Sequence, residues 1–440
     1  MILIAVLAGQ GQVLTRPEVH AYTHVLIELE SGRILSEHDA HRRMFPAATT
    51  MILTAILAYE HLDMDEIIIV GNEINQLPHQ AATIQLQVGE AITGLNLIRA
   101  MIIGQGLDAA NVVAINVARR MSDNPDMPWG DAQLFFGQLM TQRAMSLGAI
   151  NSRFVNAHGF HHANHSSTAY DLAQIARHAM SIPTIANIAS QPNFTGYMAG
   201  EGTRRRTFTS ANDLLRNFSY ARGLRTGNHN LSGEVLVAAA QRDGIMLISV
   251  TMNSPIINDA PTRWTDNINL FTYGFENYAI HQILTPATTH GQLNILNPRL
   301  GDYEYLEFYS RAEISHFMSM AELGRLETLI EFSEDFTEYY YEELRFTTAI
   351  EEGEIIGTLH HVLDGELLFS SNLYATREVL ERTTASDIDH YMGIFFSRAA
   401  LPYWIAGILA VVLLIISYII IRNRIRTSIA RQSKYKIKKL

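Results

Sequence analysis

This 440-residue chain has no cysteine and very few lysines. Its four lysines, Lys434, Lys436, Lys438 and Lys439, all lie within the last seven residues. Without cysteine no disulfide can form, which excludes a disulfide-stapled miniprotein. A chain that is 48% hydrophobic and 18% charged is neither disordered nor collagenous, and it is long enough for two globular domains.

Acidic residues are missing from the C-terminal tail. Residues 422–440 hold four arginines and four lysines, so the tail carries +8, and the formal total of −11 leaves −19 on residues 1–421. Directly before the tail, residues 401–421 are uncharged and strongly apolar, which matches the ~20 residues that a helix needs to cross a bilayer. Tyr403 and Trp404 open this run, as expected at a membrane–water boundary. The sequence predicts a single transmembrane helix, with a buried core helix as the alternative.

The same charges predict a membrane topology. Cationic residues concentrate on the cytoplasmic side of a membrane, so we expect a cytoplasmic tail, able to bind anionic lipid headgroups, and an extracytoplasmic ectodomain. Residues 1–16 start with an apolar stretch that no basic residue precedes, so we interpret them as a truncated signal-like segment. The acidic ectodomain argues against nucleic acid as a partner. The predicted location is the cell membrane, with a single pass.

Two domains are expected before the membrane helix. Residues 17–278 mix helical spacing of apolar residues with short strands, which predicts an α/β (α+β) domain with helices packed on an antiparallel sheet. Residues 281–386 alternate apolar and polar positions in short segments, which predicts a small all-β sandwich domain. Residues 387–400 are expected to be a linker. The expected helices are 47–59, 95–103, 108–121, 132–147 and 168–180, and the expected hairpins are 25–29 with 34–35, 234–240 with 245–251, and 355–362 with 366–373.

Several short motifs occur in a set order within residues 17–278. They are SGRIL at 31–35, FPAATTM at 45–51, FVNAHGF at 154–160, STAYDLA at 167–173 and GLRTG at 223–227. With them the chain resembles the low-molecular-weight penicillin-binding proteins, which are serine-type D-alanyl-D-alanine carboxypeptidases of peptidase family S11. The resemblance implies a penicillin-binding/β-lactamase-like domain, a C-terminal β-sandwich domain and a C-terminal membrane anchor. It also implies peptidoglycan stem peptides ending in D-Ala-D-Ala as the ligand.

The family's first motif is degenerate in this chain. The mechanism that the resemblance implies needs a serine at the start of a helix and a lysine one turn later, which takes the hydroxyl proton. Aligned on Pro46 and Ala47, the nucleophile position is Ala48 and the base position is Met51. A methyl group cannot attack a carbonyl, and a thioether does not accept that proton at neutral pH. Because residues 1–433 contain no lysine, no other register restores the pair.

The other two motifs differ in what they keep. The resemblance places the S-x-N motif at Gln105-Gly106-Leu107, so Gln105 and Leu107 replace both functional side chains. It places the K-T-G motif at Arg225-Thr226-Gly227, where a guanidinium, able to hold a carboxylate with two hydrogen bonds, keeps the positive charge. For Gln105, a solvated surface amide is favoured over a hydrogen bond to a peptide ligand. The candidate ligand-binding residues are Arg225, Thr226, Gly227, Gln105 and His158.

The same region offers residues for a threonine nucleophile and for a metal site. Thr49 and Thr50 are hydroxyls beside Ala48 and would need a histidine as base, whereas threonines at a helix start are more commonly caps. Four histidines cluster within residues 156–165. No H-E-x-x-H pattern occurs there, so a solvated loop is favoured over a zinc site. They are His158, His161, His162 and His165. The sequence predicts no metal site and no cofactor.

These observations lead to one hypothesis and two alternatives. The hypothesis is a membrane-anchored, catalytically inactive relative of D-Ala-D-Ala carboxypeptidases that binds stem peptides or a cell-wall enzyme without cleaving them. The first alternative is an active carboxypeptidase that uses substitute residues. The second is a scaffold that acts through the β domain. All three follow from the resemblance together with the replaced residues, and they make different predictions for the cleft.

Overall fold

The computed structural model describes residues 2–4, 16–347 and 349–437, which form two compact units. The first unit holds the described residues from Arg16 to Ile280 together with Phe317–Ala321. The second holds Ile2–Ile4, His281–His316 and the residues from Glu322 on. Apart from Ile2–Ile4 and Arg16, the predicted signal-like segment 1–16 lies outside the described residues.

A five-stranded antiparallel sheet is the centre of the first unit. Its order is β3–β2–β10–β9–β8, with bounds Ile34–His38, Thr23–Glu28, Ile245–Ser254, Gly233–Arg242 and Ala221–His229. All six residues of β2 are buried, because helices cover both faces of the sheet. Side chains of a strand alternate between the two faces, so Leu26 packs in one apolar cluster while Val25 and Ile27 pack in the other. The expected hairpins 25–29 with 34–35 and 234–240 with 245–251 are both present.

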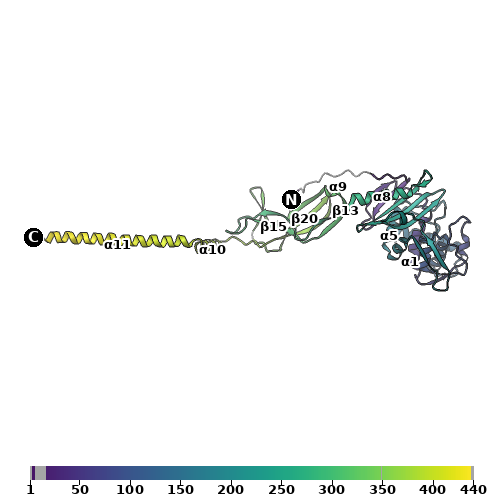
Figure 1. Cartoon of the computed structure of the whole chain (residues 1–440), viewed down its shortest axis with the longest axis horizontal. Coiled ribbons are helices and arrows are strands. Elements are labelled where there is room, and N and C mark those ends of the chain that lie inside the picture. Colours follow the sequence, from purple (N-terminus) through teal and green to yellow (C-terminus); the bar gives the residue numbers. More distant parts are fainter. Residues whose placement is uncertain (1, 5–15, 348, 438–440) are drawn as a thin grey trace. The chain divides into compact units, whose positions relative to one another are not determined.

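Helices lie on the two faces of this sheet (Figure 1). Helix α8 (Arg263–Asn277) packs on one face, where Leu214 of α7 (Leu214–Asn217) lies in the same apolar cluster. Helix α5 (Ala169–Ser181) packs on the other face, where it contacts α1 (Met51–His61) and α6 (Pro183–Ala189). The remaining helices of the first unit are η1 (Ala47–Thr50), η2 (Asn72–Gln76), α2 (Gly94–Ile102), α3 (Leu107–Met121) and α4 (Trp129–Ser146). Short hairpins complete the unit: β4 (Ile67–Ile69) with β5 (Ala91–Thr93), β6 (Asn193–Tyr197) with β7 (Arg205–Thr209), and β11 (Ile256–Ile257) with β12 (Ala260–Pro261).

The second unit is built on a six-stranded antiparallel sheet in a half-barrel. Its order is β1–β17–β20–β21–β15–β14, with bounds Ile2–Ile4, Leu326–Phe332, Ile355–Leu363, Glu366–Ala375, Tyr305–Ser310 and Thr289–Asn294. Strands β20 and β21 form the expected hairpin around Asp364 and Gly365. Its small core is rich in aromatic and branched residues such as Phe308, Phe346 and Leu359. The remaining short elements are β13 (Tyr278–Leu284), β16 (Ile314–Ser319), α9 (Met320–Leu323), β18 (Thr337–Tyr340) and β19 (Glu343–Phe346).

Two helices end the described chain. Helix α10 (Thr384–Phe395) starts with a capping box, in which the Thr383 hydroxyl accepts from Ser386 N and the Ser386 hydroxyl accepts from Thr383 N. Residues 387–395 of the expected linker 387–400 are therefore helical. Helix α11 (Leu401–Ile437) contains a stretch, Leu401–Ile429, that is long and apolar enough to cross a membrane.

The predicted fold class is confirmed. The first unit has helices packed on an antiparallel sheet, the second unit contains the all-β domain, and one long apolar helix follows. The sheet of the first unit brings residues 221–229 next to η1, although some 170 residues separate them in sequence. This contact between β8 and η1 creates the site described next.

Candidate functional site

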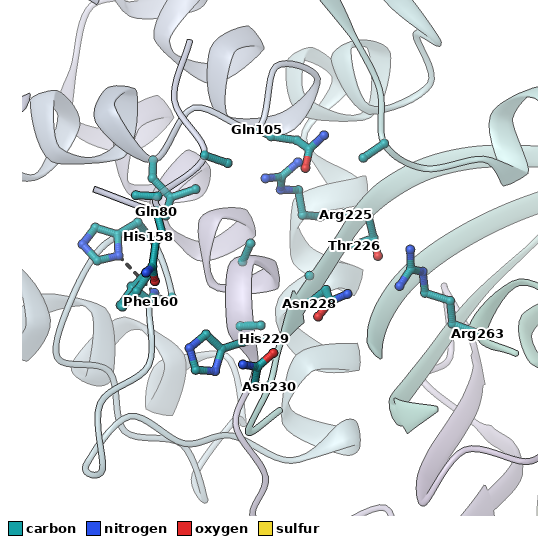
Figure 2. A pocket seen from close by; sticks show the side chains of 18 residues that line it. Gln80, Gln105, His158, Phe160, Arg225, Thr226, Asn228, His229, Asn230 and Arg263 are labelled. Atoms are coloured by element: carbon teal, nitrogen blue, oxygen red, sulfur yellow. Dashed lines mark hydrogen bonds between the residues drawn. The ribbon is translucent and has the colours of Figure 1, made fainter. Parts of the chain in front are cut away.

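Segments that are distant in sequence line one cleft of the first unit, with a volume of about 400 Å³ (Figure 2). They are the start of η1, residues 80–82, the start of α3, residues 158–160, Ala211, the end of β8 with the residues after it, and Arg263. Among the described lining residues there are two arginines but no aspartate or glutamate. Because residues 1–421 carry a large negative charge as a whole, a cleft lining without carboxylates favours an anionic ligand.

Two of these segments touch, and we call them the helix wall and the strand wall. The helix wall is Ala47 and Ala48 of η1, and the strand wall is Arg225, Thr226 and Gly227 of β8. A Cβ atom built on Gly227 would lie 2.7 Å from the backbone nitrogen of Ala48 and 2.9 Å from Ala47 Cβ. Only glycine therefore lets β8 pack this closely against the start of η1.

The loop of residues 154–160 crosses over the helix wall. Gly159 has a φ of +76°, and a Cβ atom there would collide with the carbonyl oxygen of Ala47. The amide of Asn156 closes the turn: its Oδ1 accepts from Gly159 N at 2.8 Å, and its Nδ2 donates to Phe160 O at 2.9 Å. The Asn-x-His-Gly sequence is thus the local reason that His158 lies at the cleft.

The start of α3 forms another part of the lining. Gln105 has a φ of +58°, between Gly104 and Gly106, and it is half-buried. The buried carboxylate of Asp108 accepts hydrogen bonds from the backbone N–H groups of Ile84 and Leu86 at 3.1 and 2.9 Å. These bonds hold the segment after residues 80–82 against α3, so both segments border the cleft.

Arg225 is a buried cation in the strand wall. Its side chain is 2% exposed, and burial lowers the pKa of its guanidinium to about 9. Within the part of the chain that the structure describes, no carboxylate pairs with it and its Nε makes no hydrogen bond. Figure 2 shows the Gln105 amide close to this guanidinium in projection, with His229 and Asn230 at the opposite end of the cleft. A buried charge without a partner is costly, so this position is arranged to receive an anion.

The second arginine of the cleft differs, because it has a partner. Arg263, at the start of α8, forms an ion pair with Glu234 on β9, and the Asn228 amide donates to the same carboxylate. Burial lowers the pKa of Arg263 to about 10, while the charge of Asp213 acts in the opposite direction. Arg263 is therefore a neutralised cation at the cleft, and Arg225 remains the unpaired one.

The imidazole of His158 lines the cleft in a single protonation state and tautomer. It is 7% exposed, and burial lowers its pKa to about 4, so the ring is neutral at neutral pH. Its Nδ1 accepts a hydrogen bond from Phe160 N at 3.0 Å, the dashed line in Figure 2. The neutral ring therefore carries its proton on Nε2, which is a hydrogen-bond donor.

Comparison with known proteins identifies the family. The sequence profile of peptidase family S11, described as D-alanyl-D-alanine carboxypeptidase, matches residues 10–256, which is more than half of the chain. The chain belongs to peptidase family S11. The family that the ordered motifs indicated is thereby confirmed.

Relatives and solved structures agree with this S11 assignment. D-alanyl-D-alanine carboxypeptidase DacB2 from Mycobacterium tuberculosis is 26% identical over 59% of this chain and 84% of its own length. D-alanyl-D-alanine carboxypeptidase DacC from Escherichia coli is 24% identical over 84% of this chain and 87% of its own. The crystal structure of penicillin binding protein 6B from Escherichia coli covers 83% of this chain and 99% of its own at 20% identity, with a TM-score of 0.60, which shows a shared fold.

Met51, which the sequence analysis aligns with the base position of the first motif, lies beneath the cleft. Met51 is 0% exposed and packs in the main apolar cluster, and it is not among the residues that line the cleft. Ala48 does line the cleft, at the helix wall. The other sequence candidates, Gln105, Leu107, His158 and the strand wall, line the same cleft.

Thr49 and Thr50 are buried and do not cap the helix, so the favoured interpretation of caps is wrong. The Thr49 hydroxyl donates to Pro46 O at 2.6 Å and the Thr50 hydroxyl to Ala47 O at 2.8 Å, which uses their protons inside η1. Threonines can return a hydrogen bond to the carbonyl three or four residues back, and that choice competes with capping.

His165 contacts Thr50, but it donates the hydrogen bond, whereas a base would have to accept one. His165 Nε2 lies 2.9 Å from the Thr50 hydroxyl oxygen, and Val155 N donates to His165 Nδ1 at 3.3 Å. The neutral ring therefore carries its proton on Nε2 and donates to Thr50, and burial lowers its pKa to about 3. The solvated-loop interpretation is wrong for His158 and His165, whose rings are buried.

Sequence reasoning did not single out five polar side chains of the cleft: Gln80, Asn228, His229, Asn230 and Arg263. Asn228 and His229 directly follow the strand wall, so their place after the third motif was the available signal. Arg263 carries no such signal, because only the packing of α8 beside β9 brings it to the cleft. Thr226 was included, and its hydroxyl donates to Val235 O at 2.9 Å, which leaves only its acceptor lone pairs for a ligand.

Proposed function

We propose that this S11 homologue is a catalytically inactive, membrane-anchored protein that binds peptidoglycan stem peptides through the cleft. The observation that carries the proposal is the contrast between an empty helix wall, with Ala48 at the nucleophile position, and an unpaired buried guanidinium in the strand wall. The domains 17–278 and 281–386, the transmembrane segment 401–421 and a cytoplasmic tail 422–440 belong to this proposal.

Loss of catalysis rests on the first motif. Acyl transfer needs a nucleophile next to a base, and Ala48 and Met51 supply neither. No lysine exists before Lys434, and arginine stays protonated at ordinary pH, so it does not replace the base. Thr50, a hydroxyl with a histidine contact, is 1% exposed and accepts a hydrogen bond from His165.

Ligand binding rests on the strand wall. A peptide that ends in D-alanine presents a C-terminal carboxylate, and Arg225 can hold a carboxylate with two charge-assisted hydrogen bonds. Such a ligand would supply the anion that the buried guanidinium lacks in the described residues. Gln105 and His158 add an amide and an Nε2–H donor for the peptide backbone of the ligand. A carboxypeptidase that runs on substitute residues and a scaffold that acts through the β domain are the alternatives.

Covalent labelling with a fluorescent penicillin separates the inactive protein from an active enzyme. We expect no label on the full chain in detergent after denaturation, and no D-alanine released from a pentapeptide ending in D-Ala-D-Ala. Either a label that survives denaturation or released D-alanine would show an activated nucleophile and contradict the proposal.

Calorimetry separates peptide binding from the scaffold. We expect a D-Ala-D-Ala peptide to bind, the same peptide with a C-terminal amide to bind much more weakly, and Arg225→Ala to abolish binding. Arg222→Ala is the matched control, because Arg222 lies on the same strand and is not among the residues lining the cleft. Absence of binding at millimolar peptide would favour the scaffold.

A further inference from the structure

Glu234 lies behind the lining of the cleft, near the start of strand β9. In the antiparallel register it is directly opposite Asn228 of β8. The residue is 6% exposed and is not among those that line the cleft. Its side chain contacts Asn228 and Arg263, which both line the cleft. Glu234 therefore places a negative charge directly behind two residues that a ligand can reach.

The carboxylate of Glu234 uses both of its oxygens. Asn228 Nδ2 donates to Oε1, and the guanidinium of Arg263 forms an ion pair with Oε2. The side chains of Arg263 and Glu234 are 14% and 7% exposed, so water and salt screen this pair only weakly. Losing one partner of such a pair leaves a buried charge uncompensated. Glu234 is thus the counter-ion of Arg263.

Packing that does not involve Glu234 also holds Arg263 at the cleft. Arg263 is the first residue of α8, a helix that packs against β9 and β10. Its guanidinium carbon lies 4.5 Å from the centroid of the Trp264 ring, in a cation–π contact. We therefore expect Arg263 to stay at the cleft when position 234 loses its charge. It would then be a second guanidinium that is free to bind a carboxylate.

We propose that Glu234 is a specificity-determining residue, an internal carboxylate that occupies Arg263 and so directs the carboxylate of a ligand to Arg225. This inference rests on the proposed function and adds the residue that selects where the ligand carboxylate binds. The described lining residues include two arginines and no carboxylate, and Glu234 cancels one of the two charges from behind. Because Glu234 belongs to the same chain, its effective concentration at Arg263 is high and a ligand competes with it poorly.

The chain offers a near-isosteric variant and a matched control. Glu234→Gln removes the charge, and its amide oxygen can still accept from Asn228. Asp213→Asn is the control, because the charge of Asp213 also acts on Arg263. The side chain of Asp213 is 46% exposed and pairs with Arg216. The control therefore removes a nearby charge without freeing Arg263 from its ion pair.

Calorimetry on the full chain in detergent tests the inference with acetyl-D-Ala-D-Ala and with its C-terminal amide. Arg225→Met alone should weaken binding of the acid about 10- to 100-fold. Adding Glu234→Gln should restore affinity for the acid by about 10-fold, because Arg263 becomes free, and should restore none for the amide. Adding Asp213→Asn should restore nothing. No gain from Glu234→Gln, an equal gain from Asp213→Asn, or an equal gain for the amide would overturn the inference.

A second variant keeps the test decisive if the change of charge disturbs folding. Glu234→Gln together with Arg263→Gln removes both charges of the ion pair, which proteins commonly tolerate better than the loss of one. Its affinity for the acid should equal that of the unchanged chain, because Arg263 takes no part in binding while Glu234 holds it. A loss as large as that of Arg225→Met would overturn the inference. Circular dichroism establishes that each variant folds.

Failure of this inference is distinguishable from failure of the proposed function. If the unchanged chain does not bind the acid at millimolar concentration, the proposed function fails. Binding by the Glu234→Gln variant would then still support Glu234 as the group that occupies Arg263, and absence of binding by that variant would overturn the inference as well. If the unchanged chain binds through Arg225 and Glu234→Gln restores nothing, only the inference fails.

Discussion

The helix wall and the strand wall of the cleft differ in the functional groups that they present. The strand wall carries a cation, Arg225, and the glycine that packs against η1, whereas the helix wall presents Ala48, whose side chain has no polar atom. The contact between the two walls depends on Gly227 and Gly159 and not on any side chain with a functional group. The shape of the cleft is therefore set by close backbone packing and does not require a nucleophile at position 48.

The largest expected effect comes from rebuilding the helix wall. Ala48→Ser with Met51→Lys restores the nucleophile and base of the S11 first motif, and we expect this double variant to be labelled covalently by fluorescent penicillin. Ala48→Ser alone is the matched control and should stay unlabelled, because its hydroxyl has no base. Circular dichroism establishes that both variants fold. A labelled single variant would mean that another residue of the cleft already serves as base.

Acid should weaken the loop over the helix wall. The folded-state pKa values of His158 and His165, about 4 and about 3, lie below the ordinary 6.5, so the unfolded chain binds more protons between these values. Stability is therefore complete above pH 6.5 and is lost as the pH falls toward 4, on the order of 3 kcal/mol for His158. Urea unfolding at pH 7, 5.5 and 4.5 measures this, and a pH-independent midpoint would contradict it.

Arg225 should show opposite effects on binding and stability. Arg225→Met removes charge-assisted hydrogen bonds worth roughly 1.5–3 kcal/mol, so the affinity for a D-Ala-D-Ala peptide should fall about 10- to 100-fold. Because the guanidinium is buried without an anion in the described residues, the free energy of unfolding should stay the same or rise. Calorimetry and urea unfolding give the two values. A clear loss of stability would mean that Arg225 has a structural partner.

Gly227 tests whether the two walls are held by packing. Gly227→Ala places a methyl group 2.7 Å from Ala48 N, so the walls must separate, at a cost of about 1–3 kcal/mol in the free energy of unfolding. Gly130→Ala is the control: Gly130 lies in α4 without a positive φ, and no atom comes within 4 Å of a Cβ built there. Equal destabilisation by both variants would show that the wall contact is not the cause.

The smallest effect is expected at Gln105. Gln105→Ala removes one neutral amide from the cleft, where a hydrogen bond contributes about 0.5–1.5 kcal/mol, so peptide affinity should fall only a few-fold. Leu107→Ala, at the neighbouring lining position, is the comparison without loss of an amide. Calorimetry with the same peptide measures both. If the Gln105 variant loses as much affinity as Arg225→Met, the ligand depends on α3 rather than on the strand wall.

Much of the molecule could be predicted because its signals are local or belong to ordered motifs. Apolar spacing predicted α2 and α3 to within a residue at their boundaries, and the turn around Asp243 and Gly244 predicted the β9–β10 hairpin. The helix within the expected linker was not predicted, because the polar residues at its start hide the helical spacing of its apolar residues. Thr49 and Thr50 were misjudged because a hydroxyl at a helix start can return its proton to a carbonyl instead of capping.

The sequence by itself determined the family, the apolar helix of α11, and the lack of lysine before residue 434, because these depend only on which residues stand in which order. Only the tertiary structure decided that Arg225 is buried without an anion and that Arg263 reaches the same cleft already paired to Glu234. It also decided that His165 donates to Thr50 rather than accepting from it. Burial, partners and tautomers depend on segments that are far apart in sequence, and folding alone brings those together.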